Sequence, residues 1–334
     1  MSEIHPRQVL LGPQAARHAL PVCDHYSGVE ARMKKSLLLQ AQMTQELGAC
    51  VFDVTLDCED GAPVGLEKDH AQRVAALVAE SAQEARVAVR VHAVDHPHFE
   101  EDLRIIVGQV GCKLKHVMIP KVESLQDVQT AHSLISELGF KNLAIHALIE
   151  SPNAIEHAFE IASHTSVESL SFGLMDFVSS HAGAIPSWAM TGEGQFKHPL
   201  VVRAKLALSS ACHAHAKTPS HCVVTEIEDL GALKGCAREA SQSLGYTRMW
   251  SIHPDQIRPI VEAFSPSQAE VTQASEIIMS AAAADWGPIR FEGHLHDRAS
   301  YRFYWQVLER AHATGKPLNS HVQSWFSQTS EVAA

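Results

Sequence analysis

Two carboxylates stand where apolar segments of the sequence end. Glu150 directly follows the apolar run 143–149, and Asp176 comes shortly after the run 169–173. Two carboxylate oxygens that reach one space, with water and substrate oxygens completing the shell, suit Mg²⁺. The alternative is that each carboxylate only caps the helix after it, because side-chain oxygens at helix starts accept backbone hydrogen bonds. We carry both residues forward as candidate magnesium ligands.

A denser acidic cluster follows another apolar run. Asp57, Glu59 and Asp60 fall within four positions, and carboxylates this close repel one another unless positive charge lies nearby. A bound cation, or Arg and Lys side chains from neighbouring loops, would relieve that repulsion. Alternatively, the acids form a solvated loop that faces the positive end of the next helix. Glu59 and Asp60 are therefore candidate catalytic residues.

Three basic or imidazole side chains also stand at the ends of apolar runs. Arg90 could bind a carboxylate through two parallel hydrogen bonds, neutralise the acidic cluster, or do both. Lys121 could form a Schiff base, although we favour charge balance as its role. His253, which precedes Pro254, could hydrogen-bond a substrate or shape the turn, and of these we favour the second. All three are candidate substrate-binding residues, and Arg90 is also a candidate catalytic residue.

The apolar runs that position these groups are short and continuous, which is typical of buried parallel strands. Helix-like segments alternate with them, and this alternation predicts a parallel sheet with right-handed crossovers. Eight strand–helix units with polar groups at the strand ends favour a (β/α)8 TIM barrel. An open dinucleotide-binding sheet is disfavoured, because no Gly-x-Gly-x-x-Gly turn follows any strand. The expected strands are 19–23, 49–56, 86–89, 116–120, 143–149, 169–173, 221–225 and 247–252.

The character of the sequence changes after residue 264. A Ser-Pro-Ser cap precedes an expected helix over 268–284, an irregular stretch covers 285–297, and an aromatic-rich helix follows over 298–314. We therefore expect a catalytic barrel domain at 1–264 and a C-terminal helical extension at 265–334. An amphipathic tail of this length needs a surface to bury, so we expect it to pack on a neighbouring subunit of a homo-oligomer.

Composition excludes several classes of partner. The net charge is −11 and no basic run stands out, which disfavours nucleic-acid binding. No stretch reaches the roughly 18 apolar residues of a membrane span, and the N-terminus lacks a signal-peptide pattern. Seven cysteines without a Cys-x-x-Cys pair indicate reduced thiols and a cytoplasmic setting. We therefore expect a small-molecule substrate.

These residues carry a resemblance to a known family. The chain resembles the citrate lyase β-subunit-like group of the HpcH/HpaI aldolases, which also contains malyl-CoA and citramalyl-CoA lyases. Short motifs of that family recur in the family's order across roughly residues 15 to 300. The motifs are Asp57-Cys58-Glu59-Asp60-Gly61-Ala62 with Lys68 and Arg73, Arg90-Val91-His92, Ile119-Pro120-Lys121-Val122-Glu123, Ile149-Glu150-Ser151, Gly173-Leu174-Met175-Asp176-Phe177, Ile252-His253-Pro254-Asp255-Gln256-Ile257, and Phe264-Ser265-Pro266-Ser267.

The resemblance implies a barrel assembled into trimers or hexamers. It also implies one Mg²⁺ held by Glu150 and Asp176, and a carboxylate-binding arginine at Arg90. In the malyl-CoA lyase branch a C-terminal segment lends an aspartate to the neighbouring subunit's site. The similar segment here ends at Asp297, which becomes the candidate general base, with His294 where that branch has a lysine.

The chain departs from the family pattern at several positions. Arg17 keeps the place of the N-terminal arginine and is a candidate substrate-binding residue, while Asp24 and His25 are expected to add polarity to the barrel mouth. His92 replaces an asparagine, and the acidic residue usual near strand seven is missing from 218–222. Such changes are expected to alter the substrate and leave the metal site in place.

The leading hypothesis is therefore a Mg²⁺-dependent carbon–carbon lyase. It would cleave a 3-hydroxyacyl thioester of the malyl- or citramalyl-CoA type into an acyl thioester and a 2-oxo acid by retro-Claisen or aldol chemistry. One alternative is a thioester hydrolase on the same barrel. Another is a non-catalytic subunit that binds a CoA ester or an acyl carrier. The sequence leaves open which acid is used, what carries the acyl group, and whether the oligomer is a trimer or a hexamer.

Overall fold

The computed structural model describes residues 5–12 and 19–328, and these form two units. One unit comprises residues 22–42 and 52–264, and contains the barrel. The other takes in the described parts of residues 1–21 together with 43–51 and 265–334. Residues 1–21 and 43–51, which the sequence analysis assigned to the barrel domain, thus group with the C-terminal segment.

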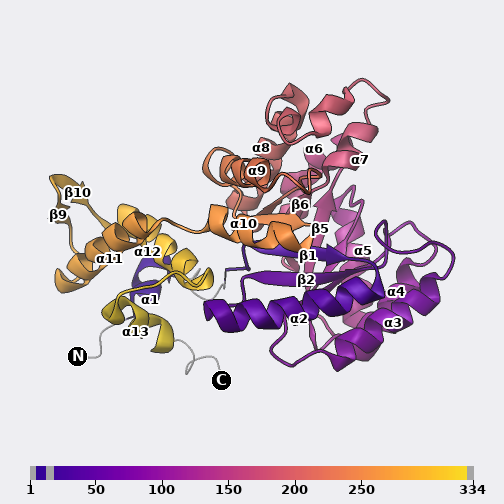
Figure 1. Cartoon of the computed structure of the whole chain (residues 1–334), viewed down its shortest axis with the longest axis horizontal. Helices are drawn as coiled ribbons and strands as arrows, with labels where there is room; N and C mark the ends of the chain where they lie inside the picture. Colours follow the sequence, from indigo (N-terminus) through magenta and orange to yellow (C-terminus); the bar gives the residue numbers. More distant parts are fainter. Residues whose placement is uncertain (1–4, 13–18, 329–334) are drawn as a thin grey trace. The chain divides into compact units, whose positions relative to one another are not determined.

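Eight parallel strands close into a barrel, in the order of the chain, and the predicted (β/α)8 barrel is confirmed. Figure 1 shows the strands at the centre of this unit and the helices outside them. The strands are β1 Cys23–Ser27, β2 Phe52–Asp57, β3 Val87–Arg90, β4 Leu114–Ile119, β5 Ala144–Ile149, β6 Val167–Phe172, β7 Thr218–His221 and β8 Arg248–Ser251. The helices are α2 Glu30–Leu47, α3 Glu67–Glu80, α4 Phe99–Val110, α5 Leu125–Glu137, α6 Pro152–Ser163, α7 Leu174–Ser179, α8 Pro199–Ala214, α9 Leu230–Gln242 and α10 Pro254–Phe264, with short 3₁₀ turns η2 Ser187–Met190 and η3 Gly194–Phe196.

Two expected strands were misplaced. The first was expected at 19–23, but β1 begins at Cys23 and carries Asp24 and His25 inside the strand. The seventh was expected at 221–225, but β7 is Thr218–His221 and pairs its Ser220 with Ser171 of β6. Both strands are buried although their sequences are polar. A prediction based on apolar runs therefore placed them at the wrong residues.

The barrel interior is layered. Side chains from β1 and β8 pack against side chains from β4 and β5, and strands on opposite sides of a barrel meet only across its interior. Each of these strands also carries a fully buried polar side chain two residues earlier. Because side chains alternate along a strand, it lies on the same face as the apolar one. The apolar layer is Tyr26, Met118, Leu148 and Trp250, and the polar layer is Asp24, His116, His146 and Arg248.

The polar layer lies toward the amino-terminal ends of the strands and pairs its own charges. The Arg248 guanidinium lies 2.8 Å from Asp24 and 2.7 Å from Asp53, and Arg86 also binds Asp53. Pairing of this kind is needed because an unpaired buried charge costs several kcal/mol. The expectation that Asp24 adds polarity to the mouth was therefore wrong, since this residue lies two positions below the apolar layer.

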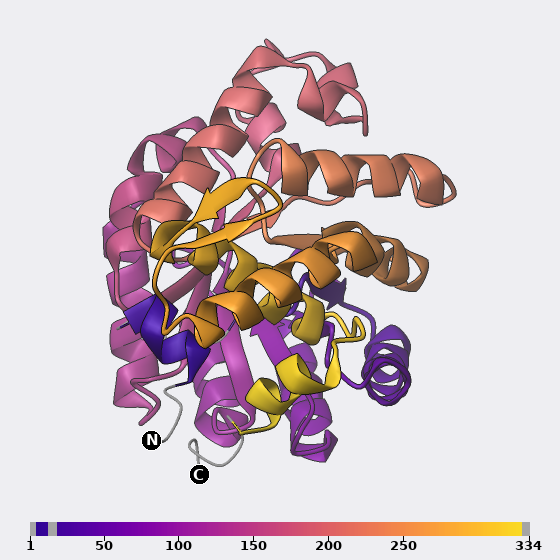
Figure 2. The ribbon, with the colours of Figure 1, turned by 90° about the vertical axis from the view of Figure 1, so that its left-hand side faces the viewer.

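The second unit is helical with one hairpin. Helix α1 Pro6–Leu11 lies beside α12 Arg298–Ala313 (Figures 1 and 2), where Arg7 and Glu309 are 3.1 Å apart. Stretch 285–297, expected to be irregular, contains the strands β9 Ile289–Phe291 and β10 His294–His296. Glu292 and Gly293 both have positive φ, the geometry of a tight hairpin turn. The remaining helices are α11 Gln268–Ala283 and α13 Ser320–Gln328.

None of the seven cysteines forms a disulfide. Within the described ranges, no helix has the length and apolar character that crossing a membrane requires.

Candidate active site

The two candidate magnesium ligands lie at the carboxyl ends of adjacent strands. Glu150 directly follows β5, and Asp176 lies in the first turn of α7, just after β6. The Glu150 side chain is buried, and its Oε1 accepts a 2.8 Å hydrogen bond from the backbone N–H of Lys121. Burial, followed by the charge of Asp176, raises the pKa of Glu150 to about 8. The structure thus brings these two carboxylates close enough to repel one another.

This pair fits a divalent cation. Among the described residues, no basic side chain forms an ion pair with either carboxylate, so their repulsion is not relieved by a direct partner. Paired carboxylates with open positions for water and substrate are the donor set that Mg²⁺ prefers. The expected roles of Glu150 and Asp176 as ligands stay a prediction, and the chemistry of the donor set agrees with it.

Gly173 allows Glu150 to take this position. A Cβ atom at residue 173 would lie 2.4 Å from Glu150 Oε2 and 2.5 Å from Glu150 Cβ. The two residues are neighbours because β5 and β6 pair Ile149 with Phe172, immediately before them. The glycine of the Gly-x-x-Asp motif is therefore required by a close approach between two strand ends.

Arg90 binds the acidic cluster. The strand register places Arg90 opposite Asp57, and the guanidinium donates to both carboxylate oxygens, from Nε at 2.7 Å and from Nη2 at 2.5 Å. Its Nη1 lies 3.1 Å from Glu59. Burial alone would raise the pKa of Asp57, but Arg90 outweighs it and holds that pKa below its ordinary value. Of the alternatives for Arg90, the structure shows charge neutralisation directly.

Lys121 joins the acidic cluster to the magnesium pair. Its backbone N–H binds Glu150, its Nζ lies 2.5 Å from Glu59 and 3.6 Å from Asp60, and its φ is +51°. Burial would lower the pKa of the Lys121 amine, but Glu59 and Asp60 raise it to about 12. A protonated amine is not a nucleophile, so this environment supports charge balance over Schiff-base formation.

Comparison with known proteins assigns this arrangement to a family. Residues 36–254 match the family model described as HpcH/HpaI aldolase/citrate lyase. The chain belongs to this family. It is 30% identical over 278 residues to the L-malyl-CoA/β-methylmalyl-CoA lyase of Cereibacter sphaeroides, an alignment that covers 77% of this chain and 87% of that protein. The predicted family resemblance is confirmed.

Two solved structures extend the comparison. A citrate lyase from Burkholderia xenovorans is 46% identical, has a TM-score of 0.81, and aligns over 97% of this chain and 99% of its own. CitE from Mycobacterium tuberculosis, in complex with magnesium, acetoacetate and coenzyme A, is 21% identical with a TM-score of 0.65, over 88% of this chain and 99% of its own. At that identity the second likeness shows the fold.

The remaining candidate residues of this HpcH/HpaI family member lie elsewhere. Arg17 falls outside the described residues. His253 follows β8, its side chain is 41% exposed, and its Nδ1 and carbonyl accept hydrogen bonds from Asp255 N–H and the Ser251 hydroxyl. Asp297 belongs to the second unit and caps α12, accepting from the N–H of Ala299 at 2.9 Å. The observed contacts of His253 and Asp297 are structural, and their catalytic roles stay predictions.

A second group of possible metal ligands lies in the polar layer. Ligand atoms of Asp24, His116 and His146 all lie within 4.8 Å of one another. Imidazole suits transition metals better than Mg²⁺, the two rings are stacked in parallel at 3.5 Å, and Arg248 already binds Asp24. Parallel rings do not aim their lone pairs at one point. We therefore treat this triad as part of the internal charge network, separate from the Glu150 and Asp176 pair.

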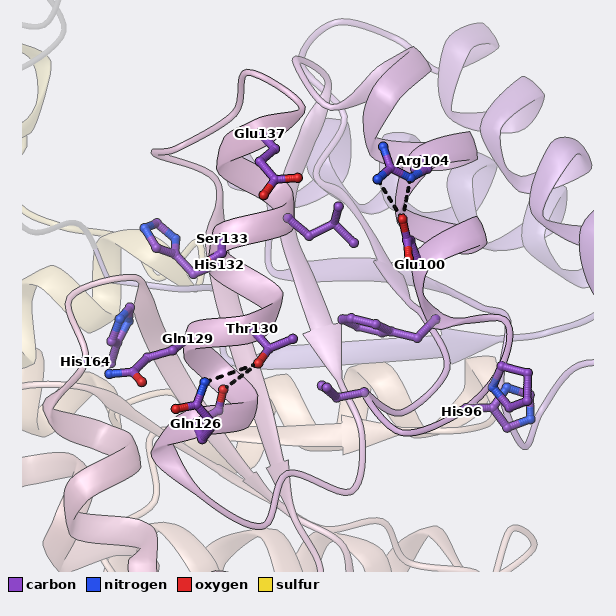
Figure 3. Close-up of a pocket in the computed structure, with 14 residues that line it drawn as sticks. His96, Glu100, Arg104, Gln126, Gln129, Thr130, His132, Ser133, Glu137 and His164 are labelled. Atoms are coloured by element: carbon purple, nitrogen blue, oxygen red, sulfur yellow. Dashed lines mark hydrogen bonds and ion pairs between the residues drawn. The ribbon is translucent and has the colours of Figure 1, made fainter.

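A surface depression of about 870 Å³ lies between α4 and α5, outside the barrel. Figure 3 shows two pairs of its side chains bound to each other: Arg104 with Glu100, and Gln126 with Thr130. His96 stands at one edge of the depression. None of the predicted catalytic, substrate-binding or metal residues lines it, so it is not the candidate active site.

Proposed function

We propose that this chain is a Mg²⁺-dependent carbon–carbon lyase acting on a 3-hydroxyacyl thioester. The observation that carries the proposal is the pair of carboxylates Glu150 and Asp176 at adjacent strand ends, which have no direct ion-pair partner among the described residues. Lys121 joins this pair to a cluster that holds a buried arginine. The names of two relatives support the choice of substrate class: a malyl-CoA/β-methylmalyl-CoA lyase and a CitE structure that holds magnesium, acetoacetate and coenzyme A.

Glu150 and Asp176 would hold the metal. Mg²⁺ bound there would supply Lewis-acid stabilisation of negative charge on a substrate oxygen. Arg90 keeps one N–H on each of Nη1 and Nη2 beyond those that bind Asp57 and Glu59. These donors, with Arg17, Lys121 and His253, would orient the carboxylate of the acid portion.

Cleavage moves two protons and one electron pair. The 3-hydroxyl gives its proton to a base, its oxygen forms a carbonyl, and the bond between C2 and C3 breaks. That bond's electron pair becomes the enolate of the acyl thioester, whose negative charge Arg90 or Arg17 would stabilise. Asp297 of a neighbouring subunit would then donate a proton to the enolate carbon, and in condensation it would remove the same proton. Glu59 and Asp60 would hold Arg90 and Lys121 in place during both directions.

This assignment requires an assembly. We propose a homo-oligomer, a trimer or a hexamer, in which the second unit of one copy completes the site of another. The other partner is a small-molecule hydroxy acid carried as a CoA thioester. None of the seven cysteines forms a disulfide, which suits a reducing compartment such as the cytoplasm.

The test measures turnover of malyl-CoA and citramalyl-CoA with Mg²⁺ or with EDTA, and identifies the products. We expect a 2-oxo acid, such as glyoxylate, together with an acyl-CoA. Glu150→Gln should lose the turnover that depends on Mg²⁺. Glu160→Gln, the same substitution at an exposed position of α6, is the matched control and should behave like the wild type. Free CoA with the intact hydroxy acid would instead identify a thioester hydrolase. Binding without turnover would identify a CoA-ester or acyl-carrier binding subunit.

A further inference from the structure

A histidine–aspartate pair lies beside Arg90 and was not among the predicted site residues. His92 comes two residues after the end of β3, and Asp102 is a buried residue of α4. One oxygen of Asp102, Oδ2, accepts from the His92 backbone N–H at 3.0 Å and bonds to the imidazole Nδ1 at 2.6 Å. A carboxylate can only accept here, so Nδ1 carries the proton and Nε2 presents its lone pair.

The surroundings of His92 connect it to the candidate site. The charge of Glu59, which binds both Arg90 and Lys121, acts on the imidazole. Glu67 of α3 acts on it from another side, and the rings of His96 and His98 lie 4.3 and 5.8 Å away. Burial would lower the pKa of His92, but the hydrogen bond and charge of Asp102 outweigh burial and raise it. The pair therefore combines a fixed ring orientation with increased proton affinity.

Asp57, Glu59 and Lys121 are less suited to accepting a proton, and Glu150 is a proposed metal ligand. Arg90 and other donors hold the pKa values of Asp57 and Glu59 below their ordinary values, although burial opposes this. Lys121 is already protonated, since its pKa is raised to about 12. A general base works best when its pKa lies near the working pH, which is the range of imidazole.

We propose that His92, oriented by Asp102, accepts the proton of the substrate's 3-hydroxyl during carbon–carbon cleavage. This assignment rests on the proposed lyase function, which leaves that proton without an acceptor. Nε2 takes the hydroxyl proton as the carbonyl forms and the C2–C3 electron pair moves into the thioester enolate. Asp297 protonates the enolate carbon, and the imidazolium returns its proton through solvent, which resets both groups. No other reactant is needed.

The test compares His92→Asn, Asp102→Asn and the wild type in the full-length protein with Mg²⁺ and malyl-CoA or citramalyl-CoA. An asparagine can still bond to Asp102 but has no group at the place of Nε2. We expect His92→Asn to lower kcat/KM by about 100- to 10,000-fold, the usual contribution of a general base. It should also remove the acidic limb of the pH profile. His157→Asn, at a half-buried histidine of α6, is the matched control.

Asp102→Asn keeps the imidazole and removes the charge that raises its pKa. We expect the acidic limb to move to lower pH in this variant, and the His92 titration followed by NMR to move the same way. If His92→Asn does not fold, this second variant still decides the question. A wild-type enzyme that cleaves the thioester while both variants keep its rate and pH profile would overturn the assignment to His92. A wild type that cleaves no thioester would instead refute the proposed function, and an unshifted NMR titration in Asp102→Asn would then refute the pairing itself.

Discussion

Replacing Gly173 with alanine tests the geometry of the magnesium pair directly. The added Cβ would lie 2.5 Å from the Cβ of Glu150 and 2.4 Å from its Oε2. Carbon atoms in contact prefer 3.5 to 4.0 Å, so one strand end must move by about 1 Å. The backbone at Gly173, with φ −97° and ψ 95°, is open to any residue, and any cost therefore comes from this contact.

The magnitude follows from the same contact. Glu150 Cβ is not the end of a flexible side chain, so rotamer changes cannot relieve the overlap. Overpacking of this kind costs about 1 to 3 kcal/mol. Gly235→Ala is the matched control. Gly235 is an exposed residue in the middle of α9, and an added Cβ would meet no atom within 4 Å. That control should gain about 1 kcal/mol through alanine's helix propensity.

Two measurements check the prediction. Urea unfolding should place Gly173→Ala below the wild type and Gly235→Ala above it. Calorimetry with Mg²⁺ should show weaker binding for Gly173→Ala, since a displaced Glu150 no longer shares one space with Asp176, and unchanged binding for the control. If Gly173→Ala matches the wild type in both stability and Mg²⁺ affinity, the close approach of these strand ends, and the metal site built on it, are wrong.

Three further substitutions test other parts of the molecule. Arg90→Lys loses the two-pronged contact with Asp57, and kinetics should show turnover reduced by about 100-fold through misplaced substrate. Burial lowers the pKa of Lys205 from 10.5 to about 8. Between pH 8 and 10.5 the Lys205 amine is therefore protonated in the unfolded chain and largely neutral in the folded protein. The stability difference in urea between the wild type and Lys205→Met should therefore shift by about 3 kcal/mol in favour of the wild type between pH 8 and 10.5. The buried cysteines have raised pKa values and lower stability over the same range, but they are common to both chains and cancel in this difference. Asp297→Ser keeps a hydroxyl acceptor at the start of α12, so stability should change by less than about 1 kcal/mol while turnover falls; unchanged turnover would remove Asp297 from the mechanism.

The sequence predicted the barrel because six strands are short apolar runs of strand length that alternate with helix-like segments. It misplaced β1 and β7 for a reason that composition cannot reveal. Asp24 is stable inside β1 because Arg248, far away in the sequence, lies 2.8 Å from it. A charge partner that distant has no periodic signal. The turn of the β9–β10 hairpin did have a local signal in Glu292 and Gly293, which the sequence analysis read as irregular structure.

The candidate site shows a similar division. Residue types and strand ends were enough to select Glu150, Asp176 and Lys121, because parallel strands deliver their following residues to one edge. The choice between substrate binding and charge neutralisation for Arg90 depended on strand register. The register places Arg90 opposite Asp57, and the two residues form an ion pair. Sequence spacing carries no information about register between strands.

The layering of the barrel explains how one interior supports two sets of buried charge. The polar layer balances Asp24 and Asp53 with Arg248, and the mouth balances Asp57 and Glu59 with Arg90. The layer of Tyr26, Met118, Leu148 and Trp250 separates them. Interactions between charges weaken with distance and with the pairing of each charge to a local partner, so the two sets act nearly independently. Substitutions in the polar layer should therefore change stability, while the proton affinity that the proposed base His92 needs is set by its own partner Asp102 and by nearby carboxylates outside that layer.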